Sequence, residues 1–217
     1  MSSDRFTPYH RLLGSLSAWG VFALGMIYLG TLVLGLLSLK SPQDPIGDPY
    51  FSLLEVLIVL MAPLLVVSLV AAHAYAAPDV KAFSFTALVF MVVAAGLTSS
   101  VHFVILSVSR PLAAAGLSGL PLLLSFTWPS VAYAVDILAW DWFFALAVLC
   151  AAPVFKAGRL GAAVRWLFVV SGVLSLAGLI GVPLADMQIR LIGVLGYAGV
   201  APVGFLLLGF VFSRARE

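Results

Sequence analysis

Six long runs of apolar residues constrain the fold of this chain more than any other feature of its sequence. Each is close to or longer than the roughly 20 residues that a helix needs to cross about 30 Å of hydrocarbon. Of the 217 residues, 63% are hydrophobic and 9% are charged, whereas soluble domains are about 45–50% apolar and about 25% charged. A soluble fold of this size has too little interior to bury so much apolar surface. We therefore predict an all-α polytopic membrane protein, in which residues 1–217 form a single helical transmembrane domain with spans at about 15–39, 51–76, 84–108, 131–155, 166–184 and 190–212.

One further segment, at about 112–128, is apolar and uncharged but does not resemble the six spans. Gly116, Gly119 and Pro121 interrupt it, and only Pro129 and Ser130 separate it from the next span. Glycine and proline inside a short apolar run disfavour a continuous membrane helix. A seventh crossing here would also place the basic loop at 156–165 on the outer side. We predict an interfacial or re-entrant segment.

The basic residues are distributed unevenly between the two sides of this six-span arrangement. Eight of the 11 Lys and Arg residues fall on the side of the two termini, whereas Lys40, Arg110 and Arg190 fall on the other. Because Lys and Arg are retained on the cytoplasmic side, we expect both termini to be cytoplasmic. The string from Tyr133 to Gly209 resembles small bacterial membrane proteins, which implies a bacterial cytoplasmic (inner) membrane.

Four ionisable residues lie within the spans, in the outer half of the expected bilayer. An ionised side chain in hydrocarbon costs from about 2.5 kcal/mol upwards, so such residues usually face a bundle interior or a watery cavity. We therefore predict a polar, protonatable cavity that opens outwards, with binding residues Glu55, Ser99, His102, Asp136, Trp140 and Asp141. Asp141 follows Asp136 by five positions, a rotation of about 140° on a regular helix. One helix can aim both carboxylates at one point only if it is distorted.

Each of these residues also has a structural interpretation. His102 can be a neutral imidazole that bonds to a neighbouring helix, and Asp136 can pair with Arg110 at the end of the third span. Asp186 and Arg190 stand four positions apart, which favours a helix N-cap with an adjoining salt bridge at the start of the last span.

No motif indicates a metal or a cofactor, and we expect neither. Three convergent ligands are needed for a catalytic zinc site, and Glu55, His102 and Asp136 are the only set that the topology brings to one side. Glu55 lies near enough to the interface to be solvated. Cys150 has no partner for an intrachain disulfide.

Three function classes remain open from the sequence. The first is a small proton-linked transporter or carrier, in which titration of the buried groups controls affinity. The second is an intramembrane enzyme that acts on a lipid or another apolar substrate, with Asp136 or Asp141 as general acid or base. The third is a non-catalytic membrane subunit or assembly factor. Partners are expected to be the lipid bilayer and a small apolar or lipid ligand, not nucleic acid, and the sequence leaves oligomerisation open.

Overall fold

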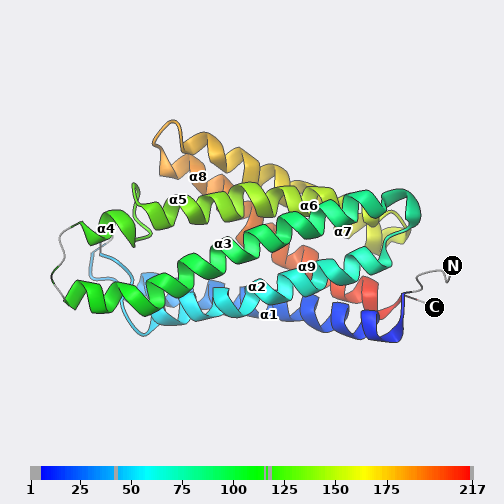
Figure 1. The fold of residues 1–217 in the computed structure, drawn as a ribbon, viewed down its shortest axis with the longest axis horizontal. Helices are drawn as coiled ribbons and strands as arrows, with labels where there is room; N and C mark the ends of the chain where they lie inside the picture. The colour runs from blue at the N-terminus through cyan, green and yellow to red at the C-terminus, as the bar shows by residue number, and fades with distance from the viewer. Residues whose placement is uncertain (1–5, 42–43, 115, 117–118, 216–217) are drawn as a thin grey trace.

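The computed structural model describes residues 6–41, 44–114, 116 and 119–215, and for residues 110–114 it describes the backbone alone. Over this part of the chain the structure is all-helical and consists of six long rods (Figure 1). The first three rods are α1 (Pro8–Leu37), α2 (Tyr50–Tyr75) and α3 (Lys81–Ala114), the last preceded by the short turn η1 (Pro78–Val80).

The last three rods are each assembled from several helical segments. The fourth joins α5 (Val131–Ile137), η2 (Leu138–Phe144), α6 (Ala145–Ala151) and η3 (Ala152–Val154). The fifth joins α7 (Gly158–Gly178) and η4 (Leu179–Gly181). The sixth joins α8 (Met187–Val194), η5 (Leu195–Val200) and α9 (Ala201–Ser213).

The six rods pack in a ring. Consecutive rods contact one another along the chain, and α9 closes the ring against α1. All six are long and apolar enough to cross a membrane, with mean hydropathy between 1.9 and 2.8 in their most apolar windows. Many large apolar side chains, such as Leu34, Leu60 and Phe103, are exposed on the outside of the ring. The predicted fold class is thus confirmed at the level of six apolar helices of spanning length.

Three of the predicted boundaries differ from the structure by six residues or more, and the first of them is the start of the first rod, which begins at Pro8 instead of about 15. The third rod continues as a helix to Ala114, six residues beyond the predicted end, and the fifth begins at Gly158 instead of about 166. All three extensions are less apolar than the predicted spans, and hydropathy predicts only the apolar part of each helix. The segment at about 112–128 does not form a rod of its own, because beyond Ala114 its only helix in the described residues is the single turn α4 (Leu120–Leu123).

Two rods depart from regular α-helix near their middle. η2 in the fourth rod and η5 in the sixth are both π-helical, a form that is rare and frequently found at functional sites. Pro202 is the second residue after η5 and lacks the N–H that a regular helix would use there, which accounts for the distortion of the sixth rod. The two π-segments face each other, because the rings of Trp140 and Tyr197 stack with centroids 5.2 Å apart.

The interior of the ring has two different halves. Near the end that holds the start of α1 and the end of α9, the rings of Phe155, Phe168, Phe205 and Phe212 are fully buried against one another. The other half contains the buried charged side chains of the described residues. This polar half is the candidate site.

Candidate functional site

His102 on α3 lies between two carboxylates. Its Nδ1 is 2.8 Å from Glu55 Oε2 on α2, and its Nε2 is 3.3 Å from Asp136 Oδ1 on α5. All three residues are buried. An imidazole donates hydrogen bonds from both ring nitrogens only when it is protonated. The geometry therefore suits an imidazolium held between two carboxylates, or a neutral imidazole beside a carboxylic acid.

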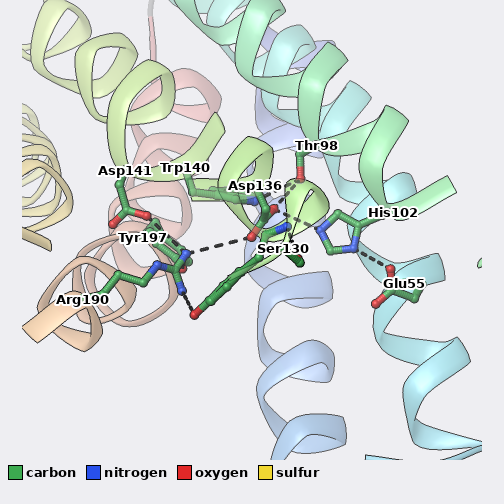
Figure 2. A network of polar contacts seen from close by, with 10 residues as sticks. Glu55, Thr98, His102, Ser130, Asp136, Trp140, Asp141, Arg190 and Tyr197 are labelled. Carbon is green, nitrogen blue, oxygen red and sulfur yellow. Dashed lines mark hydrogen bonds and ion pairs between the residues drawn. The ribbon is translucent and has the colours of Figure 1, made fainter. Parts of the chain in front are cut away.

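Arg190 on α8 continues the same chain of contacts. Its Nη2 is 3.2 Å from Asp141 Oδ2 and 4.0 Å from Asp136 Oδ2. It also donates to two phenols, from Nη1 to Tyr133 and from Nη2 to Tyr197, both at 3.0 Å. Figure 2 shows the resulting connection from Glu55 through His102, Asp136 and Arg190 to Asp141.

The predicted salt bridge between Asp186 and Arg190 is wrong, although the predicted N-cap is correct. The Asp186 side chain accepts from the backbone N–H of Gln188 at 2.9 Å and is exposed. Arg190, by contrast, is 4% exposed and points into the ring, where Asp141 and Asp136 offer it two carboxylates. Two buried acids attract a guanidinium more strongly than one solvated acid whose oxygen is already engaged in capping.

The structural alternative for Asp136 is a pair with Arg110. The Asp136 carboxylate contacts His102 and Arg190 in the structure, whereas the Arg110 side chain lies outside the described residues. His102 contacts two acidic side chains, those of Glu55 and Asp136.

The π-helix η2 explains how one rod presents two carboxylates to one guanidinium. Asp136 lies at the end of α5 and Asp141 lies within η2. A π-helix forms i→i+5 hydrogen bonds, so residues five apart are brought towards the same face. This is the distortion that the five-residue spacing requires.

Thr98 and Trp140 extend the network towards the middle of the bundle. Trp140 Nε1 donates to Thr98 Oγ1 at 3.0 Å, and Thr98 Oγ1 donates to Asp136 Oδ1 at 3.5 Å. Ser99 was predicted to take part, but it is half-buried and makes none of these contacts. On the helix α3 it is Thr98, four residues before His102, that shares the face of the imidazole.

The loop that follows α4 covers the network at its end nearest to α4. The ring of Phe126 lies over the imidazole of His102 with centroids 5.0 Å apart, and it also meets Tyr133 edge-on at 6.2 Å. Trp128 from the same loop contacts the Tyr133 ring at 6.4 Å. Ser130 N-caps α5 by accepting from the backbone N–H of Tyr133 at 3.1 Å, which fixes the point where this loop enters the fourth rod.

The charges of the network do not balance. It contains three carboxyl groups, those of Glu55, Asp136 and Asp141, and two basic groups, those of His102 and Arg190. With all five charged, one negative charge remains in a buried place, where an unpaired charge is costly. Binding one more proton or another cation would neutralise the group.

A zinc site at His102 does not fit this geometry. The two ring nitrogens point in opposite directions, one to Glu55 and the other to Asp136, so the three side chains do not converge on one point. Among the residues that the structure describes, no group of three or more His, Cys, Asp or Glu side chains is placed to hold a metal ion.

The sequence interpretation missed Arg190 and Tyr197 as members of this site. Arg190 was assigned to the helix start because it lies beside Asp186, and Tyr197 has no distinguishing neighbour in the sequence. The signal that could have revealed Arg190 is the excess of three acids within the predicted spans over the one histidine available to pair with them.

Comparisons with protein-family models, with curated proteins and with solved structures gave no match.

Proposed function

We propose that this chain is a multi-pass protein of a bacterial inner membrane and that its N-terminus and its C-terminus both face the cytoplasm. The six apolar rods and their exposed apolar side chains support insertion. The inward position of Arg190 also strengthens the charge asymmetry, because this residue no longer counts among the basic residues of the outer loops. Only Lys40 and Arg110 then oppose eight basic residues on the cytoplasmic side.

Reporter fusions in a bacterial host test this orientation. A reporter enzyme that is active only outside the cytoplasm should be inactive when fused after Ala215. The same reporter should be active when inserted after Asp44, in the loop between α1 and α2. The reverse pattern would refute the orientation.

For its activity we propose a small proton-linked carrier whose binding site is the network in the outer half of the bundle. One observation supports this proposal above all: five ionisable side chains from α2, α3, the fourth rod and α8 are joined in a continuous chain with an excess of one acid. Each of the three carboxylates forms an ion pair with a basic group from another rod. Adding or removing a proton therefore changes the contacts between rods, which is how a carrier couples protonation to a change of conformation.

The cargo class follows from the surroundings of the network. Phe126, Trp128, Tyr133, Trp140 and Tyr197 surround the charged groups with aromatic rings. Aromatic walls around a few polar groups are typical of sites for small organic molecules. The cargo is a small, largely apolar molecule or a lipid that enters from the outer leaflet.

Transport by the purified protein in liposomes provides the test. A pH-sensitive dye inside the liposomes reports proton movement while members of a panel of small organic molecules are added outside. We expect cargo-dependent proton movement that Asp136→Asn abolishes and that Asp79→Asn leaves intact. Asp79 is a matched control because it forms an exposed ion pair with Lys156 at 3.3 Å, outside the network. If Asp136→Asn and Asp141→Asn leave growth, stability and ligand binding unchanged, the carrier proposal is wrong.

A second candidate is a non-catalytic membrane subunit in which the network only fixes the packing of the rods. The direct pairing of every carboxylate in the network favours it. The two candidates differ in how stability and activity change together. Substitutions that abolish transport while the unfolding temperature stays unchanged support a carrier, and substitutions that alter only stability or assembly support a structural subunit.

A further inference from the structure

The two carboxylate oxygens of Asp141 have different surroundings. Oδ2 accepts a hydrogen bond from Arg190 Nη2 at 3.2 Å. Oδ1 is fully buried and receives no hydrogen bond from any described residue. The residue as a whole is 0% exposed, so bulk water does not reach it in this conformation.

Two glycines face Oδ1. A Cβ atom added at Gly193 of α8 would lie 1.9 Å from this oxygen, and one at Gly178 of α7 would lie 2.8 Å from it. The backbone carbonyl oxygen of Ser175 lies 3.2 Å from the same Gly193 Cβ position. Oδ1 and the Ser175 carbonyl oxygen thus both border the space that a side chain at position 193 would occupy, and no N–H group of the described residues is directed at Oδ1.

These surroundings suit a protonated oxygen better than an anionic one. An ionised carboxylate can only accept hydrogen bonds, and a buried acceptor without a donor costs about 1–3 kcal/mol or more. A protonated Oδ1 becomes a donor, and a backbone carbonyl has a second lone pair that can accept from it. A hydrated metal ion needs room that is absent where even a Cβ atom would collide, whereas a proton needs none.

We propose that Asp141 Oδ1 is the atom at which the network takes up and releases its proton, with the Ser175 carbonyl as acceptor of the resulting O–H group. This inference rests on the proposed function and identifies the proton site within it. In the net binding step an O–H bond forms at Oδ1, an O–H bond of a hydronium ion in bulk solvent breaks and leaves a water molecule there, and no electron is transferred. Asp141 then becomes neutral, and Asp136 is the remaining negative partner of Arg190.

The groups that face Asp141 come from each element packed around it. Arg190 of α8 and Tyr197 of η5 lie on one side, and Asp136 and Tyr133 of α5 share the same guanidinium. On the neighbouring helix α7 the hydroxyl groups of Ser171 and Ser175 are buried and make no hydrogen bond to any residue that the structure describes.

Infrared spectroscopy of the purified protein tests the assignment without any cargo. The carbonyl stretch of a protonated carboxyl group, which shifts in heavy water, should appear as the pH is lowered. It should disappear in Asp141→Asn and persist in the control Asp79→Asn. A band that persists in Asp141→Asn but disappears in Glu55→Gln or Asp136→Asn would overturn the proposal. Replacing choline with sodium in the buffer at constant pH tests whether a metal cation binds instead of the proton. A band that sodium abolishes would also overturn the proposal.

A second variant keeps the test decisive if Asp141→Asn does not fold. Gly193→Ala forces Oδ1 away from its present place and must move the band, whereas an unmoved band contradicts the assignment. The outcomes also separate this inference from the carrier proposal. If the band is lost in Asp141→Asn but the protein transports nothing, the proton site at Asp141 stands and the carrier proposal is wrong. If the protein transports cargo but the band comes from another acid, the carrier proposal stands and the proton site at Asp141 is wrong.

Discussion

Removing the guanidinium of Arg190 is the most informative perturbation of the network. This one group contacts the carboxylates of Asp141 and Asp136 at 3.2 and 4.0 Å and the phenols of Tyr133 and Tyr197 at 3.0 Å. Arg190→Gln therefore leaves two buried acids with less positive charge nearby. Breaking a buried ion pair by removing one partner costs about 3–5 kcal/mol.

That loss corresponds to roughly two to nearly four powers of ten in the folding equilibrium, since about 1.4 kcal/mol is a factor of ten. Reversible unfolding in detergent micelles, followed by circular dichroism, measures it. The exposed Arg159 at the start of α7 provides the matched control, and Arg159→Gln should change stability by about 0.5 kcal/mol or less.

The double variant Arg190→Gln with Asp141→Asn separates pairing from other effects. Because it removes both members of the closest pair, it should be more stable than the two single variants together predict, by about 0.5–3 kcal/mol. Asp136 keeps His102 and Thr98 in this variant. A loss below about 1 kcal/mol for Arg190→Gln, or additive single effects, would refute the view that the guanidinium holds the acids in place.

Two further predictions concern packing around the network. Gly193→Ala should destabilise the protein by about 1–3 kcal/mol because its Cβ would collide with Asp141 Oδ1 at 1.9 Å, whereas Gly199→Ala, with no atom within 4 Å of its Cβ position, should be near neutral in the same unfolding assay. Trp140→Phe keeps an aromatic ring but loses the 3.0 Å hydrogen bond to Thr98, so it should cost about 0.5–1.5 kcal/mol; an unchanged unfolding midpoint would contradict this.

The helical class and the approximate positions of the six rods could be predicted from the sequence. Long apolar runs are a local property, and a single helix of spanning length is specified by the residues within it. The boundaries at Pro8, Ala114 and Gly158 were missed because helix can continue into less apolar residues, where hydropathy carries no information.

The candidate site was predictable only in part. Glu55, His102, Asp136 and Asp141 stand out because charged or polar side chains are rare within such apolar runs. Thr98 takes part in the network in place of Ser99 because its face of α3 meets the fourth rod, and the sequence does not show which face that is. The direction of Arg190 depends on two acids that lie 49 and 54 positions away along the chain, and no local pattern contains them.

The sequence by itself determined that six helices form and that several charges must be hidden among them, because hydrophobicity and the cost of burying charge act residue by residue. Only the tertiary structure decided which charges meet. Pairing depends on the π-helical turn at η2, on the close approach that Gly193 permits, and on the closure of the ring that brings α8 beside the fourth rod. These are relations between segments distant along the chain, and the short range of hydrogen bonds and ion pairs makes them sensitive to a shift of a few ångströms.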